Sequence, residues 1–151
     1  MNKQYEFIEH TADAKFVAYG NDICNVFENA ALAMFEVMLD TASVQPLQSC
    51  DIVLSANRLD ELLHDWLSEL LFLFEVDGIA FSDFNVQSIR MGGKADNGDG
   101  GNVWTLSAKA SGETLDLQKH GFRAEIKAVT YHDLDVTCDE LGCTATVLVD
   151  L

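Results

Sequence analysis

Apolar side chains recur every three or four residues in a first stretch of the chain, residues 22–39. This spacing places them on one face of a helix. Asp22, at the start of the stretch, suits an N-cap whose carboxylate accepts hydrogen bonds from free backbone N–H groups. The apolar residues are Ile23, Val26, Phe27, Ala30, Ala31, Met34, Val37 and Met38.

A second stretch predicts another helix, with Asn57 as its N-cap, Asp60 supporting the cap and Gly78 as its C-terminal stop. Residues 70–74 are apolar almost all round, which predicts burial on two sides or a small exposed apolar patch. The apolar stripe consists of Leu59, Leu62, Leu63, Trp66, Leu67, Leu70, Leu71 and Phe74.

The other apolar segments follow a period of two or form short runs, which indicates strands. A glycine-rich segment, residues 92–102, predicts a hairpin loop, and Glu140–Gly142 predicts a turn. Because no βαβ repeat or nucleotide-binding glycine pattern occurs, we expect an α+β fold in one domain, residues 1–151: a mostly antiparallel sheet with two helices packed on one face. The expected strands are 5–9, 14–19, 50–55, 79–91, 103–110, 122–131, 134–138 and 144–151.

Charge narrows the possible functions. The chain has 25 acidic and nine basic residues, a formal net charge of −16. Direct nucleic-acid binding needs clustered Lys and Arg, which this sequence lacks. A role near RNA would then act through a basic partner or a bound cation, while the simpler interpretation is that acidity maintains solubility. No long apolar run and no signal peptide are evident, so we expect a cytoplasmic protein that does not span a membrane.

The four cysteines show no metal-binding spacing. Cys138 and Cys143 flank a short turn and could face each other across a hairpin. In a cytosolic protein we expect them to be reduced, small core residues.

No motif of a catalytic nucleophile occurs, and the four histidines lack H-x-x-x-H spacing. We therefore expect no enzymatic activity. The Glu9–Asp13 segment predicts either a polar turn or a metal-competent strand break. At the other end, the carboxylate of Asp150 adjoins the carboxylate of Leu151. Two adjacent anions either attract a hard cation or simply mark a short terminus, and spacing alone leaves both interpretations open.

Four blocks of the sequence resemble the archease family. His10-Thr11-Ala12-Asp13 resembles its HTAD signature, and Asp65–Leu71 resembles its E-W-L-x-E-L-L helix, with Asp65 in place of glutamate. Ile126–His132 is similar to the I-K-A-V-T-Y-H block of the family, and Val149-Asp150-Leu151 to its V-x-D-I/L ending. The blocks occur in family order over nearly the whole chain.

This resemblance implies an accessory protein of an RtcB-type RNA ligase, which acts in tRNA splicing or RNA repair. Archeases promote guanylylation of the ligase and its multiple turnover, and they can broaden the nucleotides that it accepts. The resemblance further implies that Asp13, Asp150 and Leu151 bind a divalent metal, Ca²⁺ or Mg²⁺. His10 and His132 could support these ligands or be structural.

Two other functions are alternatives. A chaperone or modulator of an RNA-modifying enzyme, such as a tRNA methyltransferase, would depend on the apolar segment 70–74 more than on a metal. A metal-dependent hydrolase would show turnover without a partner, although no general base with a nucleophile is evident.

Overall fold

The computed structural model describes residues 3–8, 13–94 and 102–151. The glycine-rich segment predicted as a hairpin loop lies largely outside these ranges. In chain order the elements are β1 (Tyr5–Ile8), β2 (Asp13–Gly20), α1 (Ile23–Met38), the 3-10 helix η1 (Thr41–Ser43), β3 (Gln48–Ala56), α2 (Leu59–Asp77), β4 (Ile79–Lys94), β5 (Asn102–Thr114), β6 (Ala128–Val129), β7 (Asp135–Asp139) and β8 (Gly142–Asp150).

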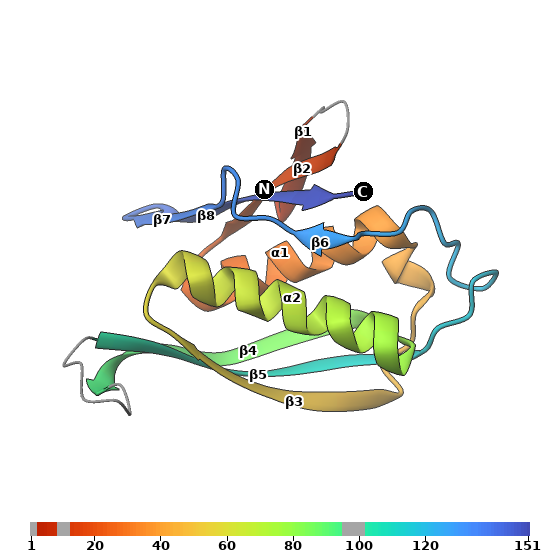
Figure 1. Cartoon of the computed structure of the whole chain (residues 1–151), viewed down its shortest axis with the longest axis horizontal. Helices are drawn as coiled ribbons and strands as arrows, with labels where there is room; N and C mark the ends of the chain where they lie inside the picture. Colours follow the sequence, from red (N-terminus) through yellow and green to blue (C-terminus); the bar gives the residue numbers. More distant parts are fainter. Residues whose placement is uncertain (1–2, 9–12, 95–101) are drawn as a thin grey trace.

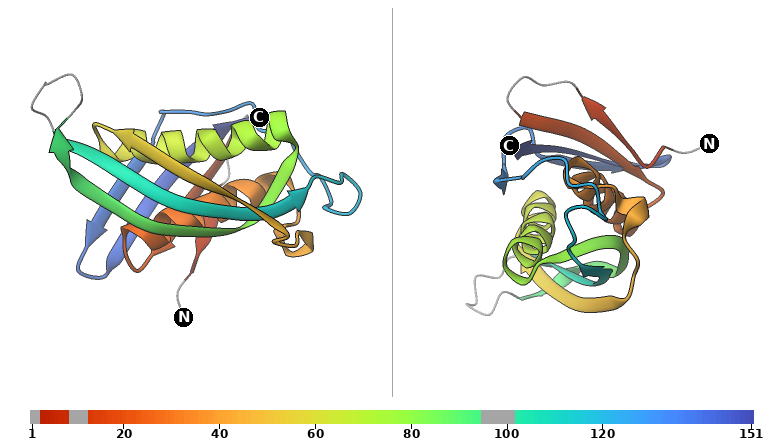
Figure 2. Two further views of the ribbon diagram at one scale, coloured as in Figure 1. Left: turned by 90° about the horizontal axis from the view of Figure 1, so that it is seen from below. Right: turned by 90° about the vertical axis from the view of Figure 1, so that its right-hand side faces the viewer.

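The two helices form a layer between two antiparallel sheets (Figures 1 and 2). In the first sheet β2 pairs with β1 and β8, and β6 and β7 share the other edge of β8. The second sheet has the order β3-β5-β4. The α+β class and the antiparallel pairing are confirmed. The strands nevertheless divide into two sheets, so the helices are covered on two faces and not on one.

Helix α1 shows why a second sheet is needed. Its N-terminus is as predicted, because the Asp22 carboxylate accepts a hydrogen bond from the backbone N–H of Asn25 at 2.8 Å. Its buried residues include Val26, Ala30 and Phe35, which do not fit on one narrow stripe. The helix packs against β2 of the first sheet and β4 of the second. A helix that is apolar on more than one side requires a covering layer on each.

Helix α2 begins at Leu59, after Arg58, so the prediction of Asn57 as the N-cap was wrong. The guanidinium of Arg58 binds the carboxylate of Asp60, and no side chain caps the helix. Asp60 and Glu61 lie in the first turn, where negative charge is favourable. Gly78, with a φ of 65°, ends the helix in the left-handed conformation as predicted.

Apolar side chains from all three layers form one buried cluster. Phe35 of α1 lies at a junction, since its ring contacts Phe74 of α2 and both Phe81 and Phe84 of β4 at centroid distances of 5.7–5.8 Å. Trp66 of α2 is fully buried and donates its indole N–H to the Phe27 carbonyl oxygen at 3.0 Å. Among the described residues, neither helix is long and apolar enough to cross a membrane.

The prediction of a strand over residues 122–131 was wrong except at β6. The segment before β6 is held against the end of α1. Asp40 donates its backbone N–H to the His120 carbonyl oxygen at 2.8 Å. The backbone N–H of Arg123 donates to the Met38 carbonyl oxygen at 2.7 Å. The Arg123 guanidinium also donates to the Glu36 carbonyl oxygen. These tertiary contacts replace the strand partners that local sequence predicts.

Glu113 at the end of β5 anchors this segment. Its carboxylate accepts from Lys119 Nζ at 2.8 and 2.9 Å, from the backbone N–H of Gln45 at 2.7 Å and from the fully buried His120 at 3.2 Å. Because Nδ1 of His120 accepts the backbone N–H of Asp116, its Nε2 carries the proton donated to Glu113. These contacts, first among them the Lys119 hydrogen bond, lower the pKa of Glu113 to about 2.

Glu113→Gln is expected to lower the melting temperature at pH 7, because the amide loses the charge-assisted bonds to Lys119 and His120. The folded-state pKa lies below the ordinary carboxylate value of 4.5. The stability that Glu113 contributes is therefore present above pH 4.5 and is lost as the pH falls toward 2. Thermal unfolding of wild type and variant should converge over that range. Glu125→Gln, an exposed change on the same segment, is the control, and a constant difference between pH 7 and pH 2 would refute this interpretation.

The expectation that Cys138 and Cys143 are reduced core residues was wrong. Cys138 of β7 lies directly opposite Cys143 of β8, their Cα atoms are 4.0 Å apart, and the two form a disulfide. Cys143 is buried, whereas Cys138 is exposed. The turn that the sequence predicted between them sets the register that brings the sulfur atoms together.

Candidate metal site

The structure brings the two ends of the predicted metal site together. β2 begins at Asp13, β8 ends at Asp150, and these residues are direct partners in the antiparallel register. Side chains at directly opposite positions project from the same face, with Cβ atoms about 4.5–5.5 Å apart. Two residues that are 137 positions apart in the sequence therefore present neighbouring carboxylates, and Leu151 follows directly.

The pleat of the strands decides which face carries these carboxylates. Phe16 and its partner Val147 are fully buried against the helices, as are Ala18 and its partner Ala145. Asp13 and Asp150 have the opposite parity on their strands, so they lie on the outer face of the first sheet. Asp13 is half-buried and Asp150 is exposed. The pair is thus supported from beneath by the core and is accessible from outside.

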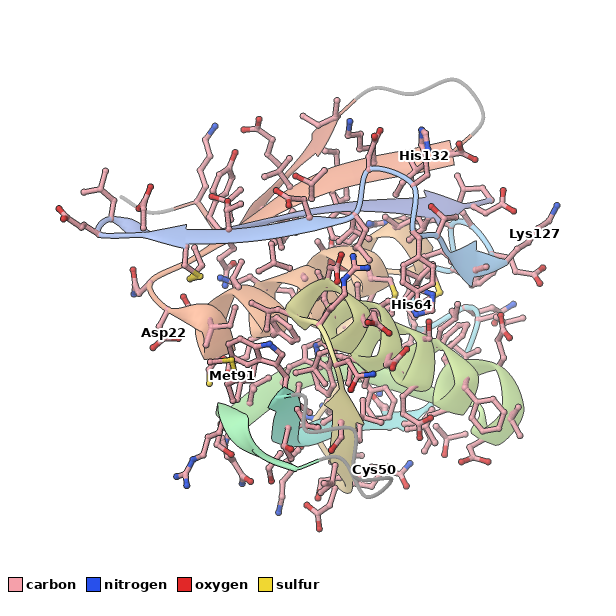
Figure 3. The ribbon with its side chains drawn as sticks, turned by 60° about the vertical axis from the view of Figure 1, so that its left-hand side comes forward. Asp22, Cys50, His64, Met91, Lys127 and His132 are labelled. Carbon is pink, nitrogen blue, oxygen red and sulfur yellow. A yellow bond between two sulfur atoms is a disulfide. The ribbon has the colours of Figure 1, made fainter. Side chains whose placement is uncertain are left out.

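Backbone hydrogen bonds hold this end of β8 on both sides. On the edge of β8 that faces away from β2, Ala128 of β6 pairs with Asp150. Lys127 also donates its backbone N–H to the Asp150 carbonyl oxygen at 2.7 Å. The side chain of Lys127 points into solvent from the start of β6 (Figure 3). A strand paired on both edges keeps the Asp150 carboxylate at a defined position, whereas an unpaired chain end frays.

A polar group borders the carboxylate pair. Lys15 lies on the same face of β2, two residues and about 7 Å from Asp13. Its ammonium group is 3.5 Å from the carboxylate of Asp133, which follows β6, and His132 Nε2 lies 3.6 Å from the same carboxylate. His132 is exposed over this end of the first sheet (Figure 3). His10 lies outside the described residues.

The donor set suits a hard cation. Carboxylate oxygens are the ligands that Ca²⁺ and Mg²⁺ prefer, and adjacent anions favour a cation between them. Within residues 3–8, 13–94 and 102–151, no three His, Cys, Asp or Glu side chains gather in a metal-binding group. The candidate site consists of the predicted ligands Asp13, Asp150 and Leu151. Metal binding at these residues stays a prediction.

Sequence reasoning did not find Lys15 and Asp133 as neighbours of the pair. The period-two pattern of β2 already places Lys15 on the face of Asp13, so the sequence contained the information needed to identify Lys15 as a neighbour. Asp133 could not have been found, because its position depends on the turn after β6, where it has a φ of 58°. Their ion pair ties this turn to the first sheet beside the two carboxylates.

The other two histidines lie apart from the carboxylate pair. His64 on α2 stacks on Tyr131 at a centroid distance of 4.0 Å, and its Nε2 is 3.1 Å from the Val129 carbonyl oxygen. His120 belongs to the Glu113 network described above. Both are held by contacts that stabilise the fold.

Known proteins resemble this chain over nearly its whole length. Residues 5–151 match the model of the Archease protein family (MTH1598/TM1083). The "Protein archease" of Methanosarcina barkeri is 48% identical over 149 residues, which cover 99% of this chain and 97% of the relative. That of Methanothermobacter thermautotrophicus is 42% identical and covers 99% of both. The solution structure of Methanobacterium thermoautotrophicum protein 1598 has a TM-score of 0.76 at 37% identity, covering 98% of this chain and 99% of that one.

Proposed function

The chain belongs to the archease family, and we propose that it is a metal-binding accessory protein that activates an RtcB-type RNA ligase in tRNA splicing or RNA repair. In this role it promotes guanylylation and multiple turnover of the ligase and performs no reaction of its own. The observation that carries the proposal is the pairing of Asp13 with Asp150 on the outer face of the first sheet.

The residues of the chain would act by binding and orienting. Asp13, Asp150 and the carboxylate of Leu151 would hold one Ca²⁺ or Mg²⁺, which supplies positive charge at the surface when bound. Pairing with β2 and β6 keeps Asp150 in place. The ion pair between Lys15 and Asp133 holds the neighbouring turn. A rigid site of this kind can position a cation against a partner without rearranging the fold.

The charge of the chain supports an indirect role at RNA. At a net charge of −16, the protein repels phosphate backbones and attracts basic surfaces. An RNA ligase needs a basic surface for its substrate, so the acidic accessory protein would bind the ligase and not the RNA. We therefore expect association with the ligase to weaken as salt rises.

A multiple-turnover joining assay tests this function. RNA ends are supplied in excess over a ligase from the same source, with and without this chain. We expect many turnovers per ligase only when the chain is present. Turnover that is independent of the chain would contradict the proposal, and phosphatase or nuclease activity of the isolated chain would favour a hydrolase.

An alternative function is that of a chaperone or modulator of an RNA-modifying enzyme such as a tRNA methyltransferase. The observation in its favour is Phe72, which is 54% exposed within the apolar segment 70–74. Asp13→Ala and Asp150→Ala separate the two functions. A modulator that depends on the apolar patch keeps its effect in both variants, whereas a metal-dependent activator loses it.

A further inference from the structure

Helix α2 carries a partly exposed row of side chains on the side away from the core. At 100° per residue, Glu61, Asp65, Glu69, Phe72 and Val76 fall within one third of the helix circumference. We call this row the α2 face. The side chains of Glu61 and Asp65 are 37% and 43% exposed, and Phe72 and Val76 are 54% and 63% exposed. The face is acidic in its first half and largely apolar in its second.

The α2 face lies along an open side of the molecule. The two sheets cover the helix layer from above and below, and α2 runs along the uncovered side between them (Figures 1 and 2). The inward residues of the same helix, among them Leu62, Trp66 and Leu70, are fully buried. The fold therefore uses the opposite side of α2 and leaves this row to solvent or to a partner.

Apart from Asp60 and Glu61 in the first turn, the charges of α2 are not arranged to stabilise the helix. It contains six acidic residues and no Lys or Arg. Glu61, Asp65 and Glu69 repel each other at spacings of four residues. Glu75 and Asp77 lie in the last turn, where the helix dipole disfavours negative charge and no basic residue compensates. Because this pattern opposes local stability, a binding role explains it better than folding does.

Exposed aromatic and aliphatic groups accompany the charge. Phe72 and Val76 are separated by one helical turn and form a small apolar patch. Near the acidic half, Tyr131 is 56% exposed and its ring is fixed by stacking on His64. Large exposed apolar groups surrounded by charge are typical of the central contacts of a protein interface.

The α2 face is connected to the candidate metal site through β6. His64 Nε2 contacts the Val129 carbonyl oxygen at 3.1 Å, and Val129 pairs with Val149, next to Asp150. Only one short strand thus separates α2 from the end of β8. A partner that binds along α2 and beyond Tyr131 would reach the edge of the carboxylate pair.

We propose that the α2 face is a docking surface for a basic surface of the RNA ligase, with Phe72 in an apolar contact surrounded by Lys and Arg side chains of the ligase. This inference rests on the proposed function and assigns the surface through which it acts. Charge complementarity selects the occupant, because the charged members of the face, Glu61, Asp65 and Glu69, are all acidic and only Arg58, at the start of the helix, lies beside them. Docking supplies affinity, and the carboxylate pair supplies activation.

Two single substitutions test the surface without disturbing the core. Glu69→Lys reverses one charge of the face and creates a favourable Asp65–Lys pair at a spacing of four residues, so its melting temperature should not fall. Phe72→Arg replaces an exposed ring by a charge that the basic partner repels. The control is Asp83→Lys, which makes the same change of charge at an exposed position on β4. Strand β4 is an edge strand of the second sheet and pairs only with β5 in the part of the chain that the structure describes.

The measurement is the Kd of the complex with the purified ligase by titration calorimetry, together with the concentration of the chain that gives half-maximal turnover. Glu69→Lys and Phe72→Arg should each raise the Kd and the half-maximal concentration at least about tenfold. At saturating concentrations of either variant, ligase turnover should equal that with wild type. Asp83→Lys should change them less than threefold.

The outcomes separate this inference from the proposed function. If wild type activates the ligase and both α2 variants bind it as tightly as wild type, the docking surface is wrong and the proposed function stands. If wild type neither binds nor activates the ligase, both are wrong. Variants that bind normally but lose turnover at saturation would also contradict docking, since the face would then act in activation itself.

Discussion

Asp150→Ala is expected to abolish activation of the RNA ligase while leaving the fold intact. Asp150 lies on the outer face of the first sheet and is exposed, so the substitution removes no core contact. It removes one of the carboxylates proposed to hold the cation. Loss of groups that merely support metal ligands lowers affinity or activity about 10–100-fold, and loss of a ligand should cost at least as much. Asp13→Ala should have the same effect, because its carboxylate is the opposite half of the pair.

The assay compares ligase turnover at saturating concentrations of wild type and variant, with circular dichroism to verify the fold. Asp51→Ala is the matched control, because Asp51 has a highly exposed side chain on β3 of the second sheet. Calorimetric titration with Ca²⁺ and with Mg²⁺ shows whether either ion binds wild type more tightly than Asp150→Ala. Full activation by both Asp13→Ala and Asp150→Ala would rule out the metal mechanism.

Phe35→Ala should produce the largest loss of stability, about 3–5 kcal/mol in the free energy of unfolding. Phe35 is fully buried and joins α1 to α2 and to β4 through three aromatic contacts. Its removal leaves a cavity between the helix layer and the second sheet, which the surrounding rings cannot fill without losing their own contacts. A domain with a total stability of 5–15 kcal/mol loses a large part of it.

Urea unfolding measures this effect, with Phe72→Ala as the control. The chemical change is identical, but Phe72 is 54% exposed, so we expect a change within about 0.5 kcal/mol. Similar losses for both variants would show that the buried cluster does not depend on Phe35 as described. The comparison also verifies that the α2 face can be altered without destabilising the fold.

Local pattern predicted the helices well because their signals are contained within each helix. The cap at Asp22, the apolar spacing of α1 and the stop at Gly78 act over a few residues. The start of α2 was missed by one residue, because Arg58 is the N-cap and pairs with Asp60 in place of an Asn57 cap. Segment 70–74 was predicted to be buried on two sides or partly exposed, and the structure shows buried Leu70, Leu71 and Phe74 beside exposed Phe72.

Features that depend on distant partners were harder to predict. Residues 122–127 have a strand-like composition, but Arg123 bonds to the end of α1 and Lys127 bonds to Asp150, which hold the segment in another conformation. The division of the strands into two sheets follows from where each helix is buried, and local periodicity does not contain that information. The turn between β7 and β8 already indicated that Cys138 and Cys143 could face each other, but the expected reduced state was wrong, because the register of the two strands joins them in a disulfide.

The candidate site was predicted in its members but not in its geometry. Asp13, Asp150 and Leu151 came from the family resemblance, and the register of β2 and β8 then placed the two aspartates side by side. The period-two pattern had already placed Lys15 on the face of Asp13, whereas the positions of Asp133 and β6 beside the pair became visible only in the structure, because they depend on tertiary contacts.

The central claim is that this chain activates an RNA ligase through its carboxylate pair. The most direct measurement is the rate at which the purified ligase takes up label from GTP at its active-site histidine, with wild-type chain, with Asp150→Ala and with no chain, at one fixed metal concentration. We predict rapid labelling with wild type and the slow rate of the ligase alone with Asp150→Ala. Equal labelling rates in all three reactions would contradict the claim.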